Sequence, residues 1–197
     1  MEEIIKRMSN VKRLSCVFTK SGDYSHNSSE FLRSEDLTQL DSLKILYRGR
    51  ALNAGEFSFP SSLKRPSLSN LSLQWDHIPT IGRLENLEVL KLVSIVFEDT
   101  TWEMSDDEFP ELKFLKLGNL NIVEWIASED HMPKLEQLVL QKCEKLNDVP
   151  IDFVEISTLQ MIEVQRCGDS VEKSVVKIKE EEKLRFGTDD LKVLIIH

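Results

Sequence analysis

The stretch LENLEVLKL at residues 84–92 decides the fold, because the chain repeats it in three further copies. These copies are FPELKFLKL at residues 109–117, MPKLEQLVL at residues 132–140 and ISTLQMIEV at residues 156–164. Their aligned leucines, Leu87, Leu112, Leu135 and Leu159, lie 25, 23 and 24 residues apart. A leucine-rich repeat has the pattern L-x-x-L-x-L-x-x-N/C-x-L with a period of about 20–29 residues. The sequence therefore predicts a repeat protein, whose usual task is to hold a partner.

Apolar residues fill positions 4 and 6 of every copy when the first aligned leucine is counted as position 1. They alternate with polar neighbours, which is the period of a half-buried strand. Weaker copies flank the centre, and their position 1 is held by Val11, Leu43, Leu63 and Leu191. The eight phrases predict an α/β fold, a leucine-rich-repeat solenoid shaped as a horseshoe arc. We expect about eight strands in a parallel sheet on the concave face and a mostly irregular convex side.

Residues 1–197 are expected to form a single leucine-rich-repeat domain, because each repeat packs only on its neighbours. Proline cannot donate to a strand ladder, so Pro66 at position 4 of its copy predicts a local defect in the sheet. Residues 20–36 are polar and rich in Ser and Asn, which indicates an inserted loop.

The C-terminal residues 168–197 are expected to cap the solenoid. Val171, Val175 and Ile178 recur with helical spacing and predict an amphipathic helix over residues 169–184. The terminal unit of a repeat array needs a polar outer face, which such a helix supplies.

A search for catalytic and ligand-binding motifs finds neither phosphate-binding glycine loops nor a histidine spacing typical of zinc sites. We therefore predict no enzyme activity, no catalytic or metal-binding residues and no cofactor in this segment.

Cys143 and Cys167 both hold position 9. This placement allows a reactive thiol pair or one edge of a metal site, but the favoured interpretation is that both cysteines are unreactive and only fill a buried turn. The acidic residues of segment 103–111 lack calcium-loop spacing and are expected to be solvated on the convex side. The tryptophans, Trp75, Trp102 and Trp125, are expected to pack between repeats on the returning side.

The side chains at positions 3, 5 and 7 should point outward from the concave sheet. Basic and apolar residues meet in the middle of this face, as expected for an interface core with charged guides. The predicted protein-binding residues are Val89, Lys91, Val93, Phe114, Lys116, Gln137, Val139, Met161 and Glu163. Free variation of these positions, with no binding role, is the alternative.

The overall charge narrows the class of partner. The net charge is -9 and the isoelectric point is near 5.0, which disfavours nucleic acid and anionic membranes. Three cysteines are no disulfide framework, and the chain has neither a signal-like start nor a transmembrane segment. We expect a protein partner and a cytoplasmic location.

Three longer phrases are informative together: VKRLSC from residue 11, FPELKFLKLGNLNIVEW from residue 109 and MPKLEQLVLQKCEKLNDVP from residue 132. They resemble the C-terminal leucine-rich-repeat region of plant coiled-coil, nucleotide-binding, leucine-rich-repeat disease-resistance proteins of the late-blight-resistance type. The resemblance covers nearly the whole chain and is strongest over residues 59–167. The coiled coil and the nucleotide-binding module of that family are absent from these residues.

The resemblance implies a non-catalytic recognition domain of a plant intracellular immune receptor. Its partner would be a pathogen effector, or the receptor's own nucleotide-binding domain, which the repeats would hold in an autoinhibited state. The alternative is a substrate-recruiting repeat module of a ubiquitin-ligase adaptor. That class normally has an adaptor-binding helical segment at its N-terminus, and MEEIIKRM is too short to form one.

Overall fold

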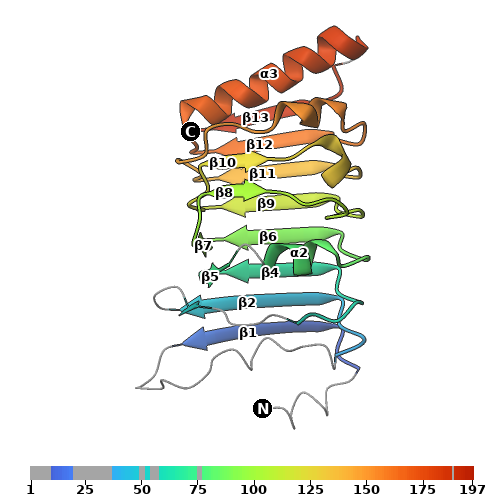
Figure 1. Ribbon diagram of the computed structural model, residues 1–197, viewed down its shortest axis with the longest axis vertical. Coiled ribbons are helices and arrows are strands. Elements are labelled where there is room, and N and C mark those ends of the chain that lie inside the picture. Colours follow the sequence, from blue (N-terminus) through green and yellow to red (C-terminus); the bar gives the residue numbers. More distant parts are fainter. Residues whose placement is uncertain (1–9, 20–36, 49–51, 54–57, 75–76, 188) are drawn as a thin grey trace.

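One parallel sheet of eight strands runs along the long axis of the molecule (Figure 1). A computed structural model describes residues 10–19, 37–48, 52–53, 58–74, 77–187 and 189–197. In sheet order the strands are β1 (Arg13–Thr19), β2 (Ser42–Arg48), β4 (Arg65–Ser69), β6 (Val89–Val93), β9 (Phe114–Gly118), β11 (Gln137–Gln141), β12 (Met161–Gln165) and β13 (Lys192–Ile196). The predicted parallel sheet is confirmed, whereas the predicted loop 20–36 and Trp75 lie outside the described residues.

The leucines of the repeated phrase form columns across this sheet. Leu90, Leu115, Leu138 and Ile162 are direct neighbours in the register, and all four are fully buried. Side chains alternate between the two faces of a strand, so the even positions point to the core and the odd positions point away from it. We call this second side, formed by positions 3, 5 and 7, the open sheet face.

The chain returns from strand to strand through short elements on the other side of the core. Strands β3 (Leu52–Asn53), β5 (Leu71–Leu73) and β7 (Val96–Phe97) form a small parallel sheet, and β8 (Thr101–Glu103) pairs with β10 (Glu124–Ile126). Helix α2 (His77–Gly82) and the 3-10 helices η2 (Glu129–His131) and η3 (Ile151–Glu155) complete this returning side. Irregular segments join these elements, as expected for the convex side.

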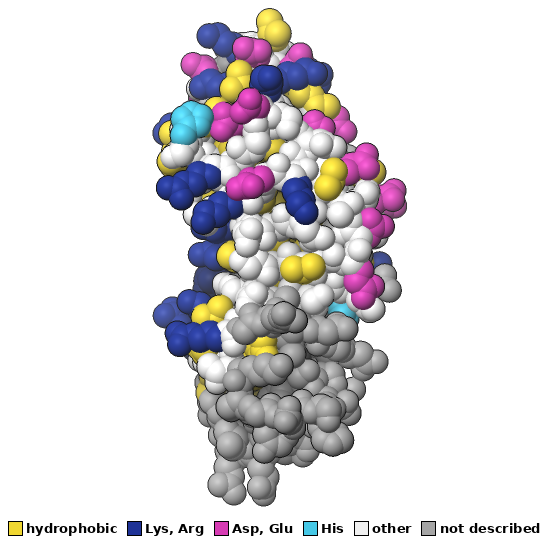
Figure 2. Space-filling view, turned by 90° about the vertical axis from the view of Figure 1, so that its left-hand side faces the viewer, with side chains coloured by type: hydrophobic (Ala, Val, Ile, Leu, Met, Phe, Trp, Pro, Cys, Tyr) yellow, Lys and Arg dark blue, Asp and Glu magenta, His cyan; other side chains and the backbone are white. Residues whose placement is uncertain are grey.

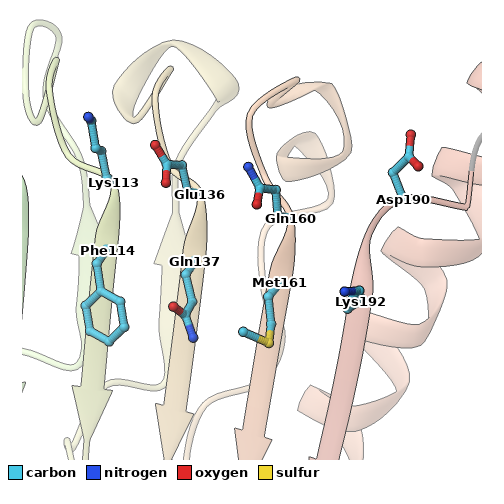
Figure 3. A pocket seen from close by; sticks show the side chains of 8 residues that line it. All are labelled: Lys113, Phe114, Glu136, Gln137, Gln160, Met161, Asp190 and Lys192. Atoms are coloured by element: carbon cyan, nitrogen blue, oxygen red, sulfur yellow. The ribbon is translucent and has the colours of Figure 1, made fainter.

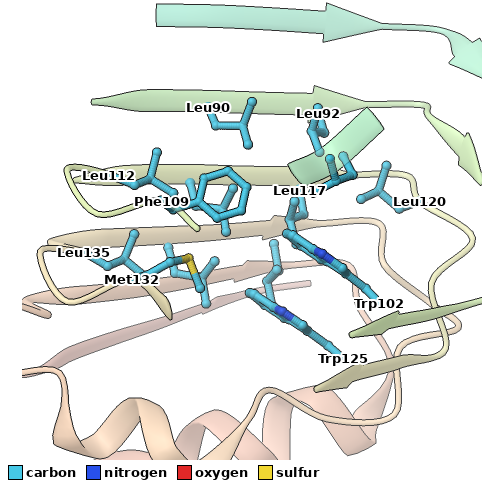
Figure 4. Close-up of a cluster of buried hydrophobic side chains, with 14 of the residues drawn as sticks. Leu90, Leu92, Trp102, Phe109, Leu112, Leu117, Leu120, Trp125, Met132 and Leu135 are labelled. Atoms are coloured by element: carbon cyan, nitrogen blue, oxygen red, sulfur yellow. The ribbon is translucent and has the colours of Figure 1, made fainter. Parts of the chain in front are cut away.

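The core lies between the sheet and the returning side, where leucines face aromatic rings (Figure 4). Trp102 and Trp125 stack with ring centroids 5.1 Å apart and an interplanar angle of 1°. Phe153 meets Trp125 edge-on at 5.1 Å, and Phe109 meets Trp102 edge-on at 6.4 Å. The expected packing of Trp102 and Trp125 between repeats is confirmed.

A left-handed residue ends the strand of five successive repeats. Position 8 has positive φ values between 50° and 59° and is held by Asn70, Ser94, Asn119, Lys142 and Arg166. The N–H of each of these residues donates to the position 7 carbonyl of the next repeat, at 2.7–2.9 Å. The turn therefore ends the strand, and its hydrogen bond connects adjacent repeats.

Pro66 produces the expected local defect. Strand β6 pairs with β9 over five residues but with β4 over only three, beginning at Ser67. Pairing of Arg65 with Val89 would require the N–H of residue 66 as a donor, and proline has none. Sheet pairing on the β2 side of Pro66 is intact.

Helix α3 (Asp169–Phe186) is the predicted C-terminal helix, and its apolar stripe of Val171, Val175 and Ile178 is fully buried. Gly168 is its N-cap, without a side-chain hydrogen bond, and Gly187 ends it with a φ of 70°. No helix in the described ranges is long and apolar enough to cross a membrane.

The predicted positions within two of the weaker phrases are wrong. Strand β2 pairs Leu43 with Leu14 and with Pro66, so Leu43 holds position 4 rather than position 1, and Ile45 and Tyr47 are buried. Strand β13 is shifted by one residue, since Val193 pairs with Ile162 and Leu194 pairs with Glu163. A slip of one residue exchanges the two faces of a strand, and Leu194 is accordingly 46% exposed.

Candidate protein-recognition face

The structure places all nine predicted binding residues on the open sheet face. Three rows cross the strands, with Val89, Phe114, Gln137 and Met161 at position 3, Lys91, Lys116, Val139 and Glu163 at position 5, and Val93 at position 7. The buried apolar side chains at positions 4 and 6 of each strand fix these outward-facing residues in place, because a strand with one buried face cannot slip in register.

Lys91, Phe114 and Lys116 form the most distinctive cluster of this face. The Lys91 ammonium lies 5.2 Å from the centroid of the Phe114 ring, which is a cation–π contact. Lys91 and Lys116 are direct partners in the β6–β9 register, so two positive charges oppose each other on adjacent strands. Neither lysine forms an ion pair within the described part of the chain. Like charges directly opposite each other on adjacent strands destabilise a sheet.

Gly118 follows Lys116 on β9 and brings no side chain to this part of the sheet. A Cβ atom added to Gly118 would be 3.4 Å from the nearest methyl carbon of Val93, in ordinary contact. The half-buried Val93 side chain therefore covers the backbone of β9 at this point.

Two of the predicted residues are less available to a partner. Val139 points to the open sheet face but is only 5% exposed, so it fills the space between its neighbours in the position 5 row. The Glu163 carboxylate accepts a hydrogen bond from the Gln165 amide, and Gln165 in turn accepts one from Gln141 at 2.8 Å. The alternation of residues along the strands predicted the face on which Val139 and Glu163 lie, but not the burial of Val139 or the hydrogen bond of Glu163.

A depression of about 430 Å³ opens at the amino-terminal ends of β9, β11, β12 and β13 (Figure 3). Three predicted residues, Phe114, Gln137 and Met161, line it. The prediction missed the other five lining residues, Lys113, Glu136, Gln160, Asp190 and Lys192. Lys113, Glu136 and Gln160 all hold position 2, directly before the strands, and this shared position is the sequence signal that could have found them.

Charge is divided between the two sides of the molecule. Figure 2 faces the carboxyl ends of the main strands and shows Lys and Arg along the sheet margin and Asp and Glu along the opposite margin. The basic residues of the open sheet face include Lys44, Arg65, Lys91, Lys116 and Lys192. The exposed acids of the returning side include Glu98, Asp99, Glu103, Asp106 and Glu124. An acidic chain thus presents a basic face.

The acidic segment of the returning side departs from its prediction at one residue. Glu108 is only 1% exposed, and one of its carboxylate oxygens has no hydrogen-bond partner. Burial is the main cause that raises the pKa of this carboxyl, against hydrogen bonds from Ser105. Within the described residues, no group of three or more His, Cys, Asp or Glu side chains could hold a metal ion.

The position 9 cysteines are neighbours, and both are free thiols. The backbone N–H of Cys143 donates to the Cys167 sulfur at 3.4 Å, and the Cys143 thiol donates to the Leu117 carbonyl at 3.5 Å. Cys143 is buried, as the favoured interpretation requires, but Cys167 is only partly buried.

Sequence comparisons match the chain to resistance proteins of Solanum demissum. The late blight resistance protein homolog R1B-13 is 35% identical over 198 residues, covering 99% of this chain, and the homolog R1B-23 is 42% identical over 121 residues, covering 60%. The late blight resistance protein R1-A is 36% identical over 160 residues, or 80% of this chain.

The matched relatives are much longer than this chain. It spans 15–17% of the length of the relatives that match over nearly its whole length. No protein-family model matches the chain. Its repeated phrases, parallel sheet and matched relatives agree, and the chain is a late-blight-resistance-like leucine-rich-repeat region of the kind found in plant disease-resistance proteins.

Proposed function

We propose that this region is a non-catalytic recognition surface of a plant intracellular immune receptor that works in the cytoplasm. Its partner is a pathogen effector, or the receptor's own nucleotide-binding domain, which it restrains until recognition. The matched relatives are resistance proteins, which favours this proposal over a ubiquitin-ligase adaptor. The cluster of Lys91, Phe114 and Lys116 on the open sheet face is the observation that carries the proposal.

Two lysines in direct register, neither of them ion-paired with a described residue, favour an acidic partner. A carboxylate placed between Lys91 and Lys116 would neutralise a repulsion that the free chain maintains. The partly buried position of both lysines strengthens that attraction, because screening by water is weaker there.

Phe114 supplies an apolar anchor in the same place. Its ring lies between the Lys91 ammonium and the depression that Met161 lines on the other side. Aromatic residues at the centre of an interface carry a large share of binding energy, while charged residues at its edge guide association. The cluster thus combines an anchor with two guides.

The test compares binding of a cognate effector, and of the receptor's nucleotide-binding domain, to the wild-type chain and to single variants. Phe114→Ala should weaken binding by about 2 kcal/mol, which is about a thirtyfold rise in Kd. Ile126→Ala is the matched control, because Ile126 is an exposed apolar residue of β10 on the returning side. It should leave the Kd unchanged.

The opposite pattern would refute the choice of face. If Phe114→Ala binds both partners like the wild type while Ile126→Ala or changes within segment 103–111 abolish binding, the returning side is the recognition surface. Circular dichroism and thermal unfolding of each variant would establish that the fold is retained.

A further inference from the structure

Cys143 and Cys167 occupy equivalent places in adjacent repeats, just after β11 and β12. The β11–β12 register ends at Gln141 and Gln165, and each cysteine follows two residues later, after a left-handed residue. Neighbouring strands lie about 4.8 Å apart. This spacing falls within the range of about 4.4–6.8 Å between the Cα atoms of disulfide-bonded cysteines. The Cys167 sulfur already lies 3.4 Å from the backbone nitrogen of Cys143, so the two cysteines are in direct contact.

The two thiols differ in their surroundings. Cys143 is 3% exposed, and its thiol donates to the carbonyls of Leu117 and Gln141 at 3.5 and 3.7 Å. Cys167 is only partly buried and accepts the backbone N–H of Cys143 at 3.4 Å. The Cys143 sulfur is thus enclosed by the core, while the Cys167 sulfur lies at the edge of the core, accepts the Cys143 N–H and can donate to the Gln165 carbonyl at 3.6 Å.

This asymmetry divides the acidity of the pair. A hydrogen bond from the Cys143 thiol is the largest cause that lowers the pKa of Cys167 to about 7, against the opposing effect of burial, and the backbone N–H of Cys143 lowers it further. The same thiol hydrogen bond, with burial, raises the pKa of Cys143. Cys16, in β1, has a pKa raised by burial alone. At neutral pH, Cys167 is therefore the sulfur that carries a substantial thiolate fraction.

We propose that Cys143 and Cys167 form an oxidant-sensitive dithiol that hydrogen peroxide converts into an intramolecular disulfide. The Cys167 thiolate attacks one peroxide oxygen, the O–O bond breaks, and a sulfenic acid and hydroxide form. The hydroxide takes up a proton to become water. The Cys143 sulfur then attacks the sulfenic sulfur, the S–O bond breaks, and the oxygen leaves as water with the Cys143 proton. Two thiols and one peroxide thus give one disulfide and two waters.

The bond would tie together the last two of the four strong phrases, directly before helix α3. Gly168, directly after Cys167, is the N-cap of α3, and a Cβ at Gly168 would lie 3.4 Å from the Glu144 carbonyl. Oxidation therefore fixes the start of α3 against the repeat that precedes it. Because the closed loop spans the whole intervening repeat, the cross-link should raise the thermal stability of the chain.

The test treats the full chain with hydrogen peroxide and maps its peptides under non-reducing conditions by mass spectrometry. We expect one linked pair, Cys143 with Cys167, which dithiothreitol reverses, and a rise in Tm of about 5 °C or more. Cys16→Ser is the matched control and should link in the same way. Cys143→Ser should abolish the link and leave a sulfenic acid on Cys167 that dimedone traps. Cys167→Ser should abolish both the link and the trapped product.

A measurement on the wild-type chain keeps the proposal testable if a variant fails to fold. Iodoacetamide should alkylate Cys167 at pH 7 about tenfold faster than Cys16 or more, because the pKa of Cys167 is lowered to about 7 whereas burial raises the pKa of Cys16. The proposal is overturned if Cys16 reacts as fast as Cys167. It is also overturned if peroxide carries Cys167 to sulfinic acid with no linked peptide.

Discussion

At the scale of single residues, the turn at position 8 ends the strand of each repeat and links it by a hydrogen bond to the next repeat. Five residues adopt the left-handed conformation there, yet none of them is glycine and only Asn70 and Asn119 are asparagine. Asparagine tolerates this conformation, whereas longer side chains resist it. The hydrogen bond from each position 8 N–H to the next repeat offsets that cost. The strain is therefore part of the repeat design and not a local defect.

Lys142→Asn should stabilise the chain. Lys142 has a φ of 53° and an exposed side chain, so asparagine would relieve strain without removing a core contact. We expect the free energy of unfolding to rise by about 0.5 kcal/mol in urea titrations. Lys145→Asn, the same change at an exposed residue nearby without positive φ, is the control and should give no gain. Equal effects of the two variants would show that loss of charge, and not backbone strain, is responsible.

Glu108→Gln should change the pH dependence of stability. Burial raises the pKa of Glu108 above its ordinary 4.5, so the folded chain binds a proton more tightly than the unfolded chain. This contribution is complete below pH 4.5 and is lost as the pH rises through the raised pKa. At pH 7 the glutamine variant should be more stable than the wild type, by about 1 kcal/mol, because it buries no charge. The gain should vanish at pH 4.

The exposed residue Glu103 is the control for that experiment. Glu103→Gln removes the same charge from the returning side without changing a buried group. Its unfolding free energy should follow the wild type at both pH values. A gain of equal size for Glu103→Gln would attribute the effect to net charge.

At the scale of elements, the sequence predicted strands well wherever leucines repeat at regular spacing. The four strong phrases have the predicted register, because apolar residues recur at positions 1, 4 and 6 in LENLEVLKL and all its copies. The phrase in β13 is apolar at four consecutive positions, VLII, so alternation cannot tell its two faces apart. In β2, Leu40, Leu43 and Leu46 offer several frames, and only pairing with β1 and β4 selects one.

The β13 register changes what is expected of Leu194. Leu115→Ala should leave a cavity in the middle of the sheet and reduce the free energy of unfolding by about 2–5 kcal/mol. Leu194→Ala should cost well under 1 kcal/mol, because Leu194 lies on the open sheet face of an edge strand and is half exposed. Both values can be measured by denaturant unfolding monitored by circular dichroism. A cost at Leu194 comparable to that at Leu115 would contradict the register.

At the scale of the whole molecule, the candidate site was predictable as a face but not as a set of contacts. The period of two places Lys91, Phe114 and Lys116 on one side of the sheet, and the structure adds that Lys91 lies over Phe114. The burial of Val139 depends on the size of the side chains on adjacent strands, which a single repeat does not encode. The division of charge between the two sides likewise emerges only when the repeats are stacked.

A single substitution should separate the stability of the fold from recognition. Lys116→Glu replaces a like-charge pair with a pair of opposite charges across β6 and β9, so the free energy of unfolding should rise by about 0.5 kcal/mol. The same change removes a basic guide from the open sheet face, so association with an acidic partner should slow by about tenfold at low salt. The difference from the wild type should shrink as salt screens the charges.

Lys142→Glu, which changes the net charge equally at an exposed turn, is the control. Equal slowing by both variants would show that net charge alone governs encounter, and a loss of stability in Lys116→Glu would show that the two lysines do not repel each other in the folded chain.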